Sequence, residues 1–108
     1  VVITSFDSNA LEIMRRIAPD LRRGYISHYD RQENLDTAIG LGCYRAGIPL
    51  HHSNKAMVQA AHAAGLNVTG WQGDSVEMLE TLLDWGVDAI TSNRPSLALD
   101  FLRKRGHL

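Results

Sequence analysis

The chain has 108 residues, a length that fits one domain with a hydrophobic core. It carries 11 basic and 12 acidic residues, so its charge gives no reason to expect binding to nucleic acid or to an anionic membrane surface. The one cysteine, Cys43, cannot form an internal disulfide, and no apolar run approaches the length of a membrane span. We therefore expect a cytoplasmic protein without a membrane span. The start on an apolar segment without Met indicates an excised segment.

The first half of the chain alternates between strand and helix patterns. Val1 to Ser5 is a continuous apolar run, typical of a parallel strand that is buried on both faces. Asp7 or Ser8 can cap the helix that follows, and Pro19 ends it. Two more helices are predicted in this half, one around the polar residues 30–36 and one from a cap at Ser53 or Asn54 to Gly65. Two more strands are predicted at Gly24–Ser27 and Gly47–His51.

The second half contains the clearest helix. A β-branched and aromatic run, Val68 to Trp71, predicts a fourth strand. Asp74 then stands at a capping position, and Glu77 three residues later completes a capping-box pattern. Gly86 can end this helix in the left-handed conformation. The pattern therefore predicts a strand, a turn and an amphipathic helix capped by Asp74.

A fifth strand and a last helix close the chain. Ala89 to Ser92 forms another apolar strand, and Pro95 is suited to the first turn of a helix, where its missing N–H costs nothing. Strands joined through helices run parallel, because the connection is too long for a hairpin. The sequence thus predicts a single unit over residues 1–108 of class α/β, either an open doubly wound sheet or an arc of a barrel.

Two motifs resemble a known family. The sequence WGVDAI followed by TSNRP, after a strand that ends in Trp71, resembles the C-terminal signature of the glycerophosphodiester phosphodiesterases, and the opening VVITSFD resembles their Ser-Phe strand. The resemblance implies a TIM-type (β/α)8 barrel, which usually needs roughly 250 residues, so the chain would be about the C-terminal half of the barrel. It also implies hydrolysis of glycerophosphodiesters to an alcohol and glycerol 3-phosphate, a reaction of lipid metabolism.

Candidate substrate contacts lie where the predicted strands end, since chemistry in parallel α/β folds gathers there. Trp71 can offer a flat apolar face to a glycerol or alcohol group and its N–H to an oxygen, and the family resemblance carries a substrate-contacting Trp onto this position. We also expect substrate contacts from Ser5, Phe6 and Asn93. Asn93 stands where many family members have an acidic residue, and Gln-Gly-Asp at 72–74 replaces the commoner Thr-Val-Asn. Both departures leave the substrate open.

The catalytic motifs of the family have no counterpart in this sequence. The resemblance implies a divalent cation, Mg²⁺ or Ca²⁺, with carboxylate ligands, two histidines for acid and base work, and a lysine. In the family these groups come from His-Arg-Gly, Glu-x-Asp, His-Asp and Glu-x-Lys motifs. This chain has two lysines, Lys55 and Lys104, and neither has a Glu two residues earlier. We therefore expect no catalytic or metal-ligating residue in this chain, and an absent N-terminal half that supplies both.

Two alternatives remain open. A non-catalytic half-barrel could act as a structural or binding module that self-associates, because its unpaired sheet edges and uncovered interior favour association. The chain could instead be another small α/β metal-dependent hydrolase with a metal site near His51 and His52. Adjacent residues of a strand point to opposite faces, so only one of these two histidines is expected to reach the mouth of a barrel.

Overall fold

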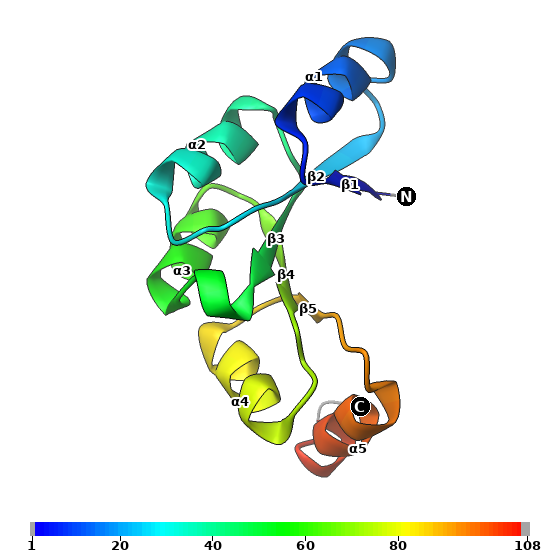
Figure 1. The fold of residues 1–108 in the computed structure, drawn as a ribbon, viewed down its shortest axis with the longest axis vertical. Coiled ribbons are helices and arrows are strands. Elements are labelled where there is room, and N and C mark those ends of the chain that lie inside the picture. Colours follow the sequence, from blue (N-terminus) through cyan, green and yellow to red (C-terminus); the bar gives the residue numbers. More distant parts are fainter. Residues whose placement is uncertain (1, 107–108) are drawn as a thin grey trace.

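The computed structural model describes residues 2–106, which form an arc of strands with helices along its outer side (Figure 1). Strands and α-helices alternate from one end to the other, with a short 3₁₀ helix, η1, after the third strand. The strands are β1 (Val2–Ser5), β2 (Arg22–Ile26), β3 (Arg45–Pro49), β4 (Asn67–Trp71) and β5 (Ala89–Ile90). The helices are α1 (Ser8–Ile17), α2 (Gln32–Gly40), η1 (Leu50–His52), α3 (Lys55–Ala63), α4 (Val76–Trp85) and α5 (Pro95–Lys104).

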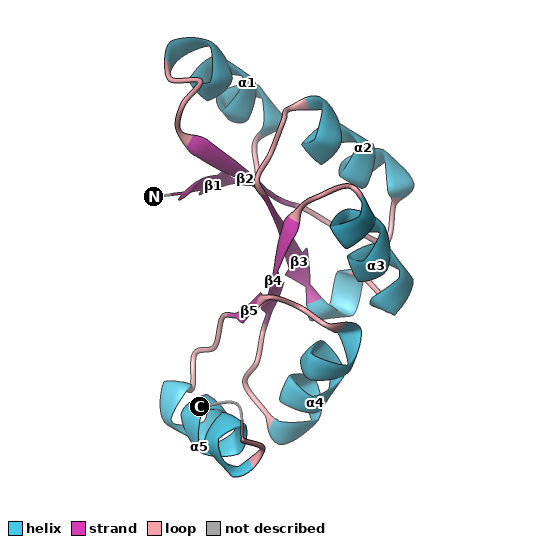
Figure 2. Ribbon diagram, turned by 180° about the vertical axis from the view of Figure 1, so that it is seen from behind, coloured by secondary structure: helices cyan, strands magenta, loops and turns pink. Residues whose placement is uncertain are grey.

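The order of the strands decides between the two predicted architectures. Within residues 2–106 the sheet has the order β1-β2-β3-β4-β5, and every neighbouring pair is parallel. Each right-handed crossover therefore adds the next strand on the same side and places its helix on the same face. Figure 2 shows α1 to α4 following one another along the convex side of the sheet. A doubly wound sheet would reverse its order and carry helices on both faces, so the fold is an arc of a (β/α) barrel.

Several predicted helix ends are confirmed. The carboxylate of Asp7 caps α1 by accepting the N–H of Asn9, and the amide oxygen of Asn54 caps α3 by accepting the N–H of Met57. Gly86 ends α4 at a φ of 78°, in the region that favours glycine. Pro95 opens α5 at its first position, as expected. These local signals fix where the helices begin and end, and hence the lengths of the loops at the site.

Four predicted strands are wrong in detail. β2 runs from Arg22 to Ile26 instead of the predicted Gly24–Ser27. β1 is not buried on both faces: Thr4 is exposed, because its side chain points to the face of the sheet that no helix covers. β3 ends at Pro49, which has no N–H for the ladder, and so does not reach His51. β5 covers two residues and stops at Ile90, two short of the prediction. The predicted Val1 lies outside the described residues.

The main core lies between the sheet and the helices. Parallel register aligns Tyr25 with Ala46 and Ala46 with Val68, so these side chains point to the same face, and all three are buried together with Ile48. Helices α2 and α3 cover this face with buried side chains that include Leu35, Ala38, Val58 and Ala61. A smaller cluster of Leu79, Ala98 and Phe101 joins α4 to α5. The opposite, concave face of the sheet carries the residues that alternate with these.

Candidate functional site

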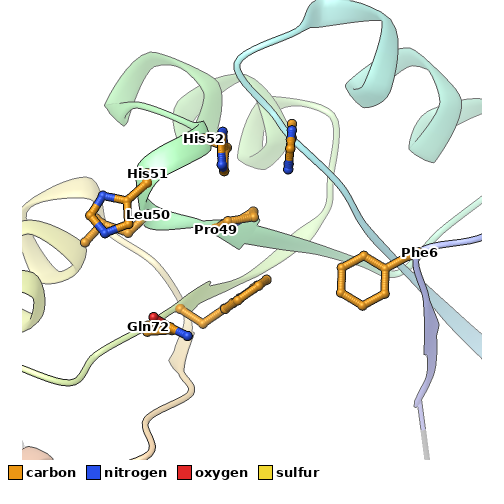
Figure 3. Close-up of a pocket in the computed structure, with 8 residues that line it drawn as sticks. Phe6, Pro49, Leu50, His51, His52 and Gln72 are labelled. Carbon is orange, nitrogen blue, oxygen red and sulfur yellow. The ribbon is translucent and has the colours of Figure 1, made fainter.

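A pocket of about 290 Å³ lies at the carboxyl ends of the strands (Figure 3). Phe6 comes directly after β1, and Trp71 is the last residue of β4. Register pairs Trp71 with Pro49 at the end of β3, which brings the two loops that follow these strands side by side. The residues that line the pocket are Phe6, His28, Pro49, Leu50, His51, His52, Trp71 and Gln72. Two of the predicted substrate contacts, Phe6 and Trp71, therefore meet in one pocket.

The two aromatic side chains present different surfaces. Phe6 is 68% exposed, so most of its ring is open to solvent at the pocket. Trp71 is half-buried and lines the pocket. A flat apolar wall with one N–H donor suits a small ligand that combines carbon and hydroxyl surfaces. The pair can thus bind a polyol or alcohol group without any charged side chain.

Three histidines line the same pocket, contrary to the expectation that only one of His51 and His52 would reach it. The two residues lie in η1 rather than in a strand, so the alternation of faces does not apply to them. The ring of His52 stacks on the ring of His28 from the loop after β2, with centroids 3.8 Å apart and planes 9° apart. The stack joins the loops after β2 and β3. Pro49 gave the available sequence signal, because it ends the strand before the histidines.

A second pocket of about 320 Å³ continues from Phe6 and Trp71 along the concave face of the sheet. Its polar members include Arg45, whose Nε donates to the side-chain oxygen of Asn67 at 3.1 Å. The complete lining is Thr4, Phe6, Ile26, Arg45, Gly47, Thr69, Trp71 and Thr91. The threonines and Arg45 were not predicted as site residues. The signal for them is the alternation of the strands, which sets Arg45 and Gly47 opposite to Ala46 and Ile48.

The predicted contacts Ser5 and Asn93 are not among the residues that line these two pockets. Ser5 pairs with Tyr25 in the β1-β2 register, and its hydroxyl accepts the N–H of Asp7 at 2.9 Å. Asn93 donates to the carboxylate of Asp74 through its backbone N–H at 2.7 Å and through Nδ2 at 3.3 Å. The carboxylate of Asp74 is therefore already hydrogen-bonded to the loop after β5.

The predicted capping role of Asp74 is wrong. The hydroxyl of Ser75 caps α4 by accepting the N–H of Met78 at 3.2 Å. Asp74 accepts hydrogen bonds from Asn93 and Ser92 instead, and the Asn93 N–H, the strongest influence, holds the pKa of Asp74 below its usual value, with a further contribution from the charge of Arg94. Asp and Ser are equally good caps, so the sequence pattern could not choose between adjacent residues.

The described residues do not fit a divalent cation. Among residues 2–106, no three His, Cys, Asp or Glu side chains come close enough together to hold a metal ion. The stacked rings of His28 and His52 lie face to face rather than converging on one point. We therefore derive no chemical step through a cation from these side chains. None of the described helices has the length and apolarity that crossing a bilayer requires.

Comparisons with known proteins agree on one family. The sequence model of the glycerophosphoryl diester phosphodiesterase family matches residues 1–97. A glycerophosphodiester phosphodiesterase from Caldanaerobacter subterraneus subsp. tengcongensis is 24% identical over 106 residues, which are 98% of this chain and 44% of the relative. This chain thus spans less than half the length of that relative.

Solved structures give the same result. A candidate glycerophosphodiester phosphodiesterase from Galdieria sulphuraria superposes with a TM-score of 0.88 at 29% identity, over 95% of this chain and 44% of its own. A phosphodiesterase from Oleispira antarctica, solved with the product sn-glycerol-3-phosphate, shares the fold with a TM-score of 0.84 at 22% identity, over 94% of this chain and 41% of its own. The arc of five strands is thus part of a larger barrel in these proteins.

Proposed function

This chain belongs to the glycerophosphoryl diester phosphodiesterase family, and from that premise we propose that it supplies the substrate-side wall of such an enzyme. The proposed reaction is hydrolysis of a glycerophosphodiester to an alcohol and glycerol 3-phosphate. The observation that carries the proposal is the pocket at the carboxyl ends of the strands, where Phe6 and Trp71 face the same space. In parallel α/β barrels this end of the strands is where substrates bind.

Within this proposal, Trp71 and Phe6 bind the glycerol part of the substrate through apolar contact. The pocket of about 290 Å³ has room for a small polyol, and the indole N–H can donate to one of its oxygens. Ser5 and Asn93 stay predictions as substrate contacts, since Ser5 is hydrogen-bonded within its own loop and Asn93 to Asp74 in the loop after β4. Trp71 is therefore the residue whose loss we expect to weaken binding most.

We propose that the catalytic residues and the divalent cation, Mg²⁺ or Ca²⁺, come from outside this chain. The described residues bring no three metal-ligating side chains together, and this also removes support from an independent metal site near His51 and His52. The family assignment to lipid metabolism and a cytoplasmic location likewise stay predictions. This chain alone is expected to be catalytically incomplete.

The number of strands bears on what completes the barrel. Residues 2–106 contribute five parallel strands, and a TIM barrel has eight, so about three strands are needed between the edges of β1 and β5. Two copies of this arc would bring ten strands together, which does not match that closure. A complementary segment of about three strands therefore fits better than self-association.

Self-association remains the second candidate, because one helix at the end of the arc is poorly covered. Helix α1 buries Leu11, but Ile13 and Ile17, four residues apart on one side of the helix, are 54% and 74% exposed. Light scattering on the purified chain separates the two candidates. A monomer at all concentrations agrees with a missing complement, whereas a discrete dimer that melts cooperatively supports the self-associating module.

A chimera tests the proposed activity. The matched region of the Caldanaerobacter relative is replaced by this chain, so that the remainder of the relative provides the missing strands. We expect the chimera to hydrolyse a glycerophosphodiester, Trp71→Ala to lose most of this activity, and Asp84→Ala, at an exposed position of helix α4 on the convex side, to keep it. A folded chimera that is inactive, or one whose activity is unaffected by Trp71→Ala, would overturn the proposal.

A further inference from the structure

We propose that Asp74 is a positioning residue that holds Trp71 and Gln72 in place by fastening the loop after β4 to the loop after β5. The carboxylate of Asp74 accepts three hydrogen bonds, and all come from the loop after β5. Its Oδ1 accepts the backbone N–H of Asn93 at 2.7 Å and the hydroxyl of Ser92 at 3.2 Å. Its Oδ2 accepts Nδ2 of Asn93 at 3.3 Å.

The fastening begins where the strand ladder ends. The N–H of Thr91 donates to the carbonyl of Gly70, and the N–H of Gly73 donates back to the carbonyl of Thr91, both at 3.0 Å. Gly73 lies so close to α4 and β5 that an added Cβ would be 2.6 Å from Ile90 and 2.8 Å from Leu79. Asp74 is the next residue and the last anchor of this segment. Trp71 and Gln72 are thus held between the ladder and Asp74.

The carboxylate of Asp74 does not cap helix α4. Ser75 caps that helix. The hydroxyl of Ser92, which donates to Asp74, also accepts the N–H of Arg94 at 2.9 Å, so the hydrogen bonds extend further along the loop after β5. Because Asp74 accepts hydrogen bonds from both the backbone N–H and the Nδ2 of Asn93, it also fixes a side chain that is predicted to contact the substrate. The two loops therefore move as one unit, and the wall of the pocket that contains Trp71 moves with them. The consequence for substrate binding rests on the proposed function.

Fluorescence of Trp71 tests the positioning without any substrate. In the full chain with Trp85→Phe, Trp71 is the remaining indole. We expect Asp74→Ala to shift its emission to the red and to raise its quenching by acrylamide roughly twofold, as a local opening exposes the ring. Asp74→Asn keeps an acceptor oxygen for Ser92 and the Asn93 N–H, so we expect it to restore most of the wild-type value.

Ser75→Ala is the matched control, because it removes a hydrogen bond of the adjacent residue and leaves the loop connection intact. It should lower stability and leave the quenching of Trp71 unchanged. Unchanged quenching in a folded Asp74→Ala chain, or the same increase in Ser75→Ala, overturns the proposal. If Asp74→Ala does not fold, Ser92→Ala removes one donor to Asp74, and the proposal then requires a smaller increase in quenching.

The chimera separates this proposal from the proposed function. There, Asp74→Ala should raise KM with little change in kcat, because the wall that binds substrate is loosened while the catalytic residues are untouched. An inactive chimera with a positive fluorescence result rejects the proposed function and keeps the positioning role. An active chimera with no change in the fluorescence of Asp74→Ala rejects the positioning role alone.

Discussion

The two faces of the five-stranded sheet differ strongly in how deeply their side chains are buried. On the convex side, Ala46, Ile48 and Val68 are completely buried beneath the helices. On the concave side, the residues between them are Arg45, Gly47 and Thr69, which line an open pocket. One face is thus a closed hydrophobic core, whereas the other is an open surface of mixed apolar and polar side chains. In a complete barrel such a face is covered by the other strands.

The two arginines of the sheet show the same contrast. Arg23 faces the helices and is 8% exposed. Its guanidinium donates to four backbone carbonyls in the loops that precede β2 and β3, those of Pro19, Leu21, Leu41 and Gly42. Arg45 faces the concave side and donates to the side chain of Asn67. The buried Arg23 therefore ties neighbouring loops together, whereas the half-exposed Arg45 makes one side-chain hydrogen bond beside the open pocket.

The largest expected effect is on the covered face. Ile48→Ala should lower the free energy of unfolding by about 3 kcal/mol, because it leaves a cavity among side chains that cannot collapse around it. Thr4→Ala on the concave face should change it by less than about 0.5 kcal/mol. Urea denaturation followed by circular dichroism measures both. Equal effects of the two substitutions would contradict the distinction between the faces.

The arginines provide the next test. Arg23→Met should cost about 2 kcal/mol, since it keeps the apolar stem but leaves buried carbonyls without their donor. Arg45→Met is the matched control and should cost less than about 1 kcal/mol, because the Asn67 side chain it leaves is accessible to water. A smaller loss for Arg23→Met than for Arg45→Met would show that the carbonyl contacts of Arg23 contribute little.

The sequence predicted the covered face better than the concave one. Apolar periodicity reports burial against elements of the same chain, and Leu35 and Ala38 of α2 are buried as that pattern predicts. In α3 the prediction was wrong in part: Ala56 and Ala64, expected on the inward face, are exposed, whereas Val58 is buried. The concave face and the loops depend on partners distant in the sequence. His28 stacks on His52 across 24 positions, and Asp74 contacts Asn93 across 19. Local patterns contain no information about such pairs, so the capping box was assigned to the wrong residue.

The edge of the covered face gives a pH-dependent prediction. Asp88 precedes β5, and its Oδ2 accepts the N–H of Val68 at 2.7 Å and contacts Nε2 of His62 at 2.8 Å. Burial alone would raise the pKa of Asp88, but these hydrogen bonds outweigh it and hold the pKa below its usual value. The carboxylate therefore stabilises the fold above about pH 3.9, the usual pKa of Asp, and this contribution is lost as the pH falls through the lower folded pKa.

We expect Asp88→Asn to lower the Tm at pH 7 by about 3 °C, since the side chain is partly exposed and the interaction is screened. The fall in Tm between pH 5 and pH 3 should be shallower than in the unmodified chain. Asp84→Asn is the control, because its pair with Lys55 at 3.5 Å lies in solvent. An acid-side slope identical to that of the unmodified chain would show that Asp88 does not hold β5 in place.

The smallest expected effect has the opposite sign and lies on the concave face. The hydroxyl of Thr69 is buried, and it has no hydrogen-bond partner among residues 2–106. Thr69→Val replaces this hydroxyl by a methyl group of similar size, so we expect the isolated chain to gain about 0.5 kcal/mol in urea denaturation. Thr91→Val, at an exposed position of the same face, should be neutral. A loss of stability in Thr69→Val would mean that the hydroxyl is already satisfied in the isolated chain.

If the gain in the isolated chain becomes a loss in the chimera, the hydroxyl acquires its partner from the remainder of the barrel, as expected for a face that is completed by another segment.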